Sequence, residues 1–234
     1  MPPDEMKESQ KIGVLNEKHL HASLKSWYAQ PGDRFEVLVD GFLVDIVRDE
    51  LLIEVQTKNF AAIKRKLKGL VSDHPVRLVY PVIRQKWIVR LDGDGARIGR
   101  RKSPRRGMLT DVFQELVSFP ELVRHPNFSL EILSIDEEEV RYRNENRRWR
   151  RRGWAIQERR LLNVVGRSLI EMPADMATLV PPGLTEPFTT TDLAMAIGRS
   201  RRLAQKMTYC LRAIGCIAVV GKQGNTVLYT RIPV

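Results

Sequence analysis

Residues 42–58 read FLVDIVRDELLIEVQTK, and the expected architecture is built around this segment. Residues 42–47 and 51–57 are short, apolar and rich in β-branched side chains, which predicts two strands joined near residues 48–50. If Asp49 and Glu50 form a two-residue turn, residue 47 pairs with residue 52. Asp45 then lies directly across the hairpin from Glu54.

The two opposed carboxylates of this hairpin repel one another. A hard divalent cation, which both acids coordinate through oxygen, is the usual explanation for such a pair. Side chains alternate along a strand, so Gln56 and Lys58 share the face of Glu54. A register slip of one residue would put the two acids on opposite faces and remove the argument.

A third acid lies on the helix expected over residues 15–28. At about 100° per residue, Glu17 falls within roughly 60° of Leu20, Leu24 and Tyr28 and points inward with them. An inward carboxylate is costly unless it is paired, hydrogen-bonded or bound to metal. A buried structural ion pair, for instance with Lys58, is the alternative.

The elements around the hairpin indicate an α/β domain. A strand over residues 35–39 precedes the hairpin and is joined to it at Asp40-Gly41, a tight-turn dipeptide. A basic helix from residue 59 or 60 to 71 follows, and then strands over residues 76–80 and 87–91. The order α-β-β-β-α-β predicts a sheet covered by helices.

Glu17 on a leading helix, Asp45, and then EVQTK at residues 54–58 ahead of a helix together resemble the PD-(D/E)XK nuclease superfamily, most of all its Holliday-junction-resolvase and Mrr-like branches. The resemblance covers about residues 12–91. It implies a mixed sheet flanked by helices and Mg²⁺-dependent (or Mn²⁺-dependent) phosphodiester hydrolysis in DNA. Asp45 and Glu54 would be the metal ligands, with Glu17 as an accessory ligand.

The sequence departs from this superfamily at one position. The superfamily's lysine usually lies two residues after the acid, where this chain has Gln56, although some members also carry glutamine there. Lys58 lies two residues further along the same face, and its long side chain could reach back to the same point. The implied catalytic set is therefore Glu17, Asp45, Glu54, Gln56 and Lys58.

The chain divides into three parts by composition. Residues 1–95 form the nuclease-like domain, and residues 96–160 form a basic connecting region with a helix over 110–119 and a strand over 128–135. Within this region we expect residues 97–107 to be a polar break and Asp136–Glu139 to be a solvated turn rather than a second metal site. Residues 161–234 form the third part, which begins with a helix near residues 161–171.

Residues 189–231 have the pattern of two helices and a hairpin. Thr189-Thr190-Thr191-Asp192 offers N-cap residues, Gly198 marks a turn, and a second helix carries basic side chains outward. Strands over 216–220 and 226–231 flank a glycine-containing turn. The pattern resembles a winged helix-turn-helix, which implies duplex DNA binding; dimerisation or protein contact is the alternative. The implied DNA contacts are Arg199, Arg201, Arg202, Gln205, Lys206 and, on the wing, Lys222.

Arginine and tryptophan alternate in the segment RRWRRRGW at residues 147–154. Guanidinium groups suit phosphates, and tryptophan can stack on bases. We expect Arg147, Arg148, Arg150 and Arg151 to contact DNA; a solvated basic loop is the alternative.

Charge and composition agree with a DNA partner. The formal net charge is +11, and residues 96–234 carry +10 of it. Two cysteines, Cys210 and Cys216, exclude a disulfide framework and suit the reducing cytoplasm. The longest apolar stretches are too short to span a bilayer, so no membrane partner is expected.

Two classes of function follow. The first is a metal-dependent DNA endonuclease with a basic C-terminal DNA-binding module, in restriction, phage defence or repair, acting as a homodimer or in a larger complex. The second is a non-catalytic DNA-binding or regulatory protein that retains a degenerate nuclease fold.

Overall fold

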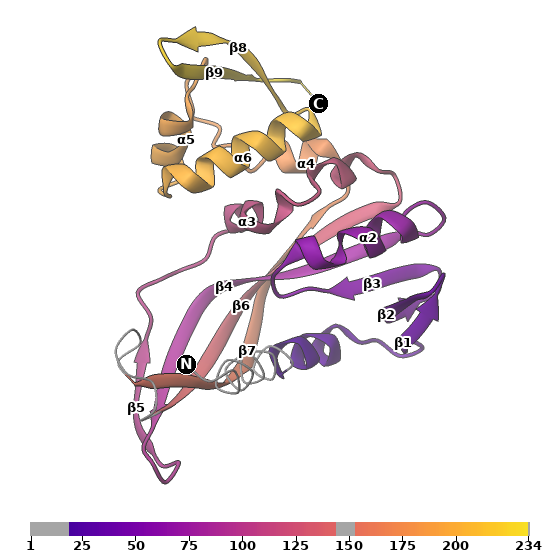
Figure 1. Ribbon diagram of the computed structural model, residues 1–234, viewed down its shortest axis with the longest axis vertical. Coiled ribbons are helices and arrows are strands. Elements are labelled where there is room, and N and C mark those ends of the chain that lie inside the picture. Colours follow the sequence, from indigo (N-terminus) through magenta and orange to yellow (C-terminus); the bar gives the residue numbers. More distant parts are fainter. Residues whose placement is uncertain (1–18, 144–152, 234) are drawn as a thin grey trace, which may run out of the picture. The chain divides into compact units, whose positions relative to one another are not determined.

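The computed structural model describes residues 19–143 and 153–233. These residues form a mixed α/β structure with a seven-stranded sheet of order β1-β2-β3-β4-β6-β7, in which β5 pairs with β4 (Figure 1). A second, two-stranded sheet consists of β8 and β9. The predicted class, a mixed sheet flanked by helices, is confirmed. The strands are β1 (Arg34–Val39), β2 (Phe42–Arg48), β3 (Leu51–Val55), β4 (Val76–Leu91), β5 (Arg97–Lys102), β6 (Phe128–Arg143), β7 (Trp154–Ile170), β8 (Ile217–Gln223) and β9 (Thr226–Arg231).

Most of the labelled helices are short. They are α2 (Phe60–Leu70), α3 (Phe113–Leu116), α4 (Pro173–Ala177), α5 (Thr190–Ala196) and α6 (Arg201–Ile214), with 3₁₀ helices η1 (Leu109–Val112) and η2 (Pro120–Arg124). Residues 19–28 are also helical.

The chain splits into two compact units. The first contains residues 1–31, 81–108 and 133–167, and the second contains residues 32–80, 109–132 and 168–234. The strands β4, β6 and β7 each contribute residues to both units. Residue 161, where we expected the third part of the chain to begin, lies inside β7.

The register of the β2–β3 hairpin is the predicted one. Ile46 pairs with Ile53, Val47 with Leu52 and Arg48 with Leu51. The preceding β1–β2 turn has Asp40 and Gly41 at φ 48° and 78°, the left-handed region in which glycine and aspartate are tolerated. On its other edge β3 pairs with β4 in parallel, with Glu54 opposite Leu78.

An aromatic cluster forms part of the core of the second unit. Phe60 at the start of α2 stacks on Phe119 at 5.4 Å between ring centroids, and it meets the edge of Tyr80 at 5.0 Å. Phe119 also contacts Phe128 of β6 at 6.4 Å. Leu67 and Leu70 of α2 are fully buried, so the helix is fixed by its apolar stripe.

In the first unit, the helix over residues 19–28 buries the predicted face. Leu20, Leu24 and Tyr28 are at most 4 % exposed. Arg167 of β7 lies over the rings of Trp27 and Tyr28, at 5.8 and 5.4 Å from their centroids, so this helix contacts β7.

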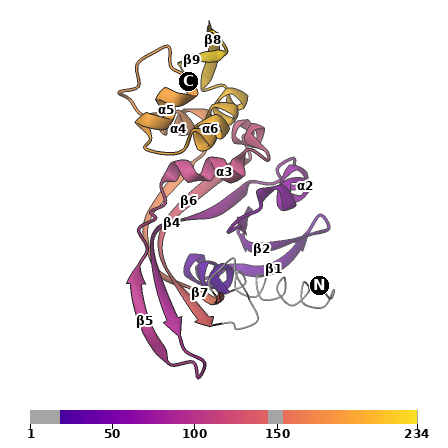
Figure 2. The same cartoon turned by 60° about the vertical axis from the view of Figure 1, so that its left-hand side comes forward.

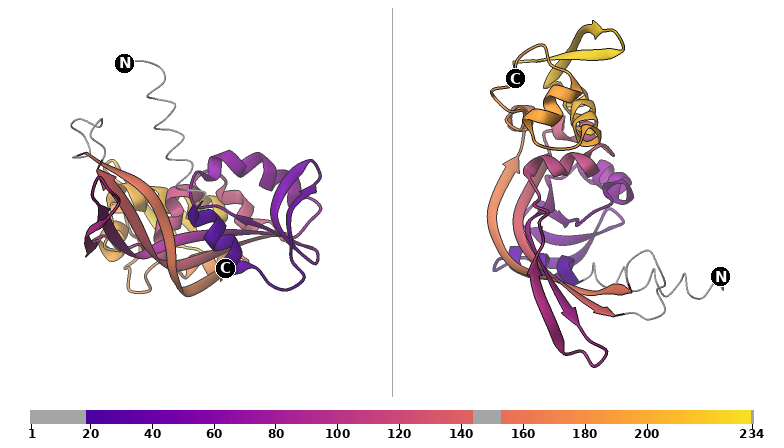
Figure 3. Two further views of the ribbon diagram at one scale, coloured as in Figure 1. Left: turned by 90° about the horizontal axis from the view of Figure 1, so that it is seen from below. Right: turned by 90° about the vertical axis from the view of Figure 1, so that its left-hand side faces the viewer.

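The two predicted C-terminal helices and the hairpin after them are present (Figure 3). The Thr189 hydroxyl accepts hydrogen bonds from the backbone N–H groups of Thr191 and Asp192, which caps α5 as predicted. Gly215 ends α6 at φ 91°. The inward residues predicted for α6, all buried, are Leu203, Met207, Leu211 and Ile214.

Three predicted elements are wrong because strands pair with distant partners. Residues 76–80 and 87–91 belong to one strand, β4, which continues through Pro81. The expected basic break contains β5, which pairs antiparallel with β4 (Figure 2). The helix expected near residues 161–171 is the end of strand β7, because pairing with β6 overrides its ambiguous local spacing.

Two further expectations need correction. The helix expected over residues 110–119 is only a 3₁₀ turn followed by one turn of α-helix, η1 and α3. The acidic run Asp136–Glu139 is not a solvated turn but part of β6, and Glu137 and Glu139 are buried. Lys86 of β4 lies 2.7 Å from the Glu137 carboxylate and 2.9 Å from that of Glu139, so a cation from another strand stabilises these charges.

Candidate functional site

The carboxylates of Asp45 and Glu54 lie beside one another on β2 and β3. The backbone N–H of Asp45 donates to Oε1 of Glu54 at 3.3 Å. In the other direction, the backbone N–H of Val55 donates to Oδ2 of Asp45 at 3.0 Å. Each acid therefore bonds to the strand that carries the other, as the predicted register requires.

Glu54 lies in an environment that disfavours its charge. The residue is 4 % exposed, and burial, followed by repulsion from Asp45, raises its pKa to about 7. The opposing influence is Lys66 of α2, whose ammonium forms an ion pair with Oε1 of Glu54 and also donates to the carbonyl of Leu43. Near neutral pH this carboxyl is therefore divided between its charged and neutral forms.

Gln56 and Lys58 follow Glu54 at the end of β3. The backbone N–H of Gln56 donates to the carbonyl of Val79, at 2.9 Å, beyond the end of β3. Its side-chain amide donates to the carbonyl of Lys58 at 2.5 Å. Lys58 is exposed in the segment between β3 and α2, and Lys66 of α2 is a cation that contacts Glu54.

We did not predict a role for Lys66 from the sequence. The criterion applied to Glu17, a charged residue on the apolar face of a helix, also selects Lys66. At about 100° per residue Lys66 lies roughly 60° from Ile63 and 40° from Leu70, on the apolar stripe of α2. A lysine at such a position either extends to solvent or meets a buried acid. Here it meets Glu54.

The described carboxylates are the type of ligand that a hard divalent cation prefers, but there are only two of them among the described residues at this site. Asp45 and Glu54 supply two adjacent carboxylates, one of them buried, and their mutual repulsion is what a bound cation would relieve. Within residues 19–143 and 153–233, no group of three or more acidic, histidine or cysteine side chains could hold a metal ion. The predicted accessory ligand, Glu17, lies outside the described residues.

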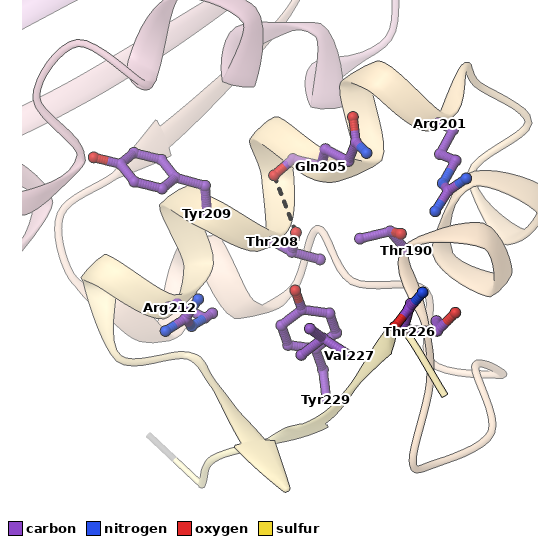
Figure 4. A pocket seen from close by; sticks show the side chains of 10 residues that line it. Thr190, Arg201, Gln205, Thr208, Tyr209, Arg212, Thr226, Val227 and Tyr229 are labelled. Carbon is purple, nitrogen blue, oxygen red and sulfur yellow. Dashed lines mark hydrogen bonds between the residues drawn. The ribbon is translucent and has the colours of Figure 1, made fainter. Parts of the chain in front are cut away.

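A polar pocket of about 270 Å³ lies between α6 and the β8–β9 hairpin (Figure 4). Arg201, Gln205, Tyr209 and Arg212 line it from one face of α6, with Thr190 of α5 beside them. Asn225, Thr226, Val227 and Tyr229 line it from the hairpin. No acidic side chain lines the pocket, which therefore suits an anionic or polar partner.

The other predicted basic residues of this region divide into three groups. Arg199 donates to Asp111 at 3.4 Å, and Lys206 donates to the Gln114 carbonyl at 2.8 Å, so both contact the η1–α3 segment. Arg202 and, on β8, Lys222 are exposed. The predicted contacts Arg147, Arg148, Arg150 and Arg151 lie outside the described residues.

The family model for a domain of unknown function (DUF8091) matches residues 18–171. The chain belongs to this family. The matched region contains Asp45, Glu54 and Lys66 and ends one residue after β7, so α4, α5, α6 and the hairpin follow the family domain.

An uncharacterized protein of Treponema pallidum (strain Nichols) is 32 % identical over 224 residues, which cover 95 % of this chain and 88 % of that protein. The similarity therefore extends beyond the family domain into the C-terminal helices and hairpin. No solved structure matches the chain. Among the described helices, none is long and apolar enough to cross a membrane.

Proposed function

We propose that this protein is a divalent-cation-dependent DNA endonuclease of the PD-(D/E)XK type. The observation that carries the proposal is the contact between Asp45 and Glu54 on paired strands, with Glu54 buried and its pKa raised to about 7. Perturbed, adjacent carboxylates are more frequent at functional sites than elsewhere, although structural ion pairs also produce them.

Asp45 and Glu54 would hold Mg²⁺ or Mn²⁺, with Glu17 as the accessory ligand. There the cation would supply Lewis-acid chemistry for hydrolysis of a phosphodiester. Glu54 must be deprotonated to bind the cation, so its raised pKa makes the site dependent on pH near 7.

Lys66 takes the role that the superfamily's lysine suggested for Lys58. Its ammonium already contacts Glu54, and positive charge at this position would stabilise negative charge that develops on phosphate oxygens. Gln56 lies at the end of β3, where its amide orients the segment that carries Lys58.

The C-terminal helices and hairpin would bind duplex DNA in the manner of a winged helix-turn-helix. Arg201 and Arg212 are eleven residues apart on α6, about 16 Å along the helix axis. The major groove is about 12 Å wide, so the two arginines could reach the phosphates at its borders while Gln205 and Tyr209 face the bases. Lys222 on the hairpin would add a phosphate contact. A homodimer or a larger complex fits the same proposal.

Incubation of the purified chain with supercoiled plasmid tests the proposal. Mg²⁺ or Mn²⁺ should produce nicked or linear DNA, and EDTA should prevent it. Intact plasmid under every metal condition, with duplex binding retained, would instead support the second function.

That second function is a non-catalytic DNA-binding protein with a degenerate nuclease fold. It is favoured by the ion pair between Lys66 and Glu54, since a lysine at this position can neutralise a buried acid without any metal. In this case Asp45, Glu54 and Lys66 would serve stability alone.

A further inference from the structure

A second basic surface lies in the first unit, on the antiparallel pair formed by residues 87–91 of β4 and residues 97–102 of β5. We name it the β4–β5 ribbon. Residues 96–110 contain six arginine or lysine residues and no acid. Five of the six residues of β5 are exposed, so this charge lies at the surface.

The cations on β4 that face β6 are neutralised by carboxylates. Arg84 forms a two-bond pair with Asp136 at 2.8 and 3.0 Å. Lys86 contacts the buried carboxylates of Glu137 and Glu139. These cations serve the fold of the first unit and are not available to a partner.

The cations of β5 are arranged differently. Arg100 lies over the ring of Trp87 at 3.9 Å from its centroid, and Lys102 lies 5.6 Å from the same ring. Arg100 is also paired with Glu138 at 2.8 Å, whereas Arg97 and Arg101 contact no carboxylate within the residues that the structure describes. Trp87 thus holds cations in place without neutralising them.

Neighbouring cations on one strand repel one another and lower its stability. In the isolated protein, these charges keep the edge strand from pairing with other chains. A bound phosphate backbone would offset the repulsion more strongly, because guanidinium groups bind phosphate oxygens in two-bond pairs and release counterions. A two-stranded ribbon also fits the major groove of duplex DNA.

We propose that the β4–β5 ribbon is a second surface that binds duplex DNA, through phosphate contacts that do not depend on base sequence. Arg97 and Arg101 make these contacts, and Trp87 holds Arg100 and Lys102 on the face of β5 opposite to that of Arg101. The inference rests on the proposed function only in that the partner is DNA. It requires no cleavage.

The test compares two variants of the full chain that lose the same formal charge from the same unit. In Arg97→Gln/Arg101→Gln the ribbon loses cations without carboxylate partners. In the control Arg84→Gln/Arg160→Gln the lost cations are exposed and paired with Asp136 and Glu158. Binding of a short mixed-sequence duplex is measured by fluorescence anisotropy in EDTA over a range of salt concentrations, after circular dichroism has verified that both variants are folded.

For the ribbon variant we expect the slope of log K against log salt concentration to fall by about 2, with roughly tenfold weaker binding at low salt. The control should keep the wild-type slope. Equal losses in the two variants would overturn the inference in favour of net charge alone. Unchanged binding in the ribbon variant would overturn it in favour of edge protection. EDTA prevents cleavage, so these results are independent of whether the protein is a nuclease.

Discussion

At the scale of single residues, Glu54 is a buried carboxyl whose pKa is raised well above its usual value. Its pKa rises from 4.5 to about 7, chiefly because it is buried and then because Asp45 is adjacent. A raised folded-state pKa means that the folded protein binds the proton more tightly than the unfolded chain does. The resulting stability is fully present below pH 4.5 and is lost as pH rises through 7.

The Glu54→Gln variant does not lose stability in this way as pH rises, because the glutamine side chain is neutral at every pH tested. Relative to the wild type, the metal-free variant should gain about 3 kcal/mol of unfolding free energy between pH 4.5 and 7 and keep a constant difference above that range. Urea denaturation in EDTA across this pH range measures the effect. Parallel stability curves for the two proteins would contradict the assignment of the raised pKa to Glu54.

Lys66 offsets part of the free-energy cost of burying the charged Glu54 carboxylate, so its removal should lower the stability of the folded protein. Lys66→Met leaves the buried Glu54 carboxylate without its cation and should lower stability above pH 7 by about 1–3 kcal/mol. Lys68→Met on the same helix is the matched control, because its partner Glu121 is half exposed and the ion pair contributes about 0–1 kcal/mol. Equal effects of the two substitutions in thermal or urea unfolding would contradict the role given to Lys66.

At the scale of elements, α6 presents two different basic faces. Lys206, with Arg199 just before the helix, contacts the η1–α3 segment, whereas Arg201 and Arg212 line the pocket beside the hairpin (Figure 4). In the proposed mode of binding, the pocket face is the one that meets DNA. Substitution of Lys206 should therefore change stability more than DNA binding.

Arg201→Gln/Arg212→Gln should weaken duplex binding by about 2 kcal/mol, roughly 1 for each lost phosphate contact. Arg202→Gln is the control matched to the single substitution Arg201→Gln, since Arg202 is exposed on the same helix but does not line the pocket. Anisotropy titrations in EDTA measure all three variants. A control that loses as much affinity as Arg201→Gln would contradict the choice of face.

Local signals in the sequence predicted the elements that depend on local chemistry. The β2–β3 register follows from a two-residue turn at Asp49 and Glu50, and α5 follows from its capping residues. Distant partners determine the rest. β5 and β7 are strands because β4 and β6 pair with them, and Glu139 is tolerated in β6 because Lys86, Arg141 and Arg159 surround it.

The same limit applies to the candidate site. The sequence predicted that Asp45 and Glu54 face one another, because strand pairing fixes both positions. It did not predict Lys66, since the helix that carries this lysine could lie in several orientations on the sheet. Only the packing of Phe60, Leu67 and Leu70 decides which helix residue meets Glu54.

At the scale of the whole molecule, the region that follows the family domain packs against elements of that domain and is not joined to it by a linker alone. α6 lies against α3 and η2 in the second unit, and Lys206 and Arg199 bond to the η1–α3 segment. A chain that ends at Glu171 exposes the apolar residues that α6 covers. It should melt at a clearly lower temperature than the full chain in differential scanning calorimetry, whereas an independent C-terminal domain would leave the melting of residues 1–171 unchanged.

We propose that Asp45 and Glu54 bind a divalent cation for DNA hydrolysis. Single-turnover cleavage of plasmid by saturating protein in Mn²⁺ or Mg²⁺ tests it most directly, with Asp45→Asn compared with Asp49→Asn. Asp49 is exposed in the turn of the same hairpin at φ 52°, a conformation that asparagine tolerates. We predict that Asp45→Asn abolishes cleavage while duplex binding and folding persist, and that Asp49→Asn cleaves at the wild-type rate. Wild-type cleavage by Asp45→Asn would contradict the account.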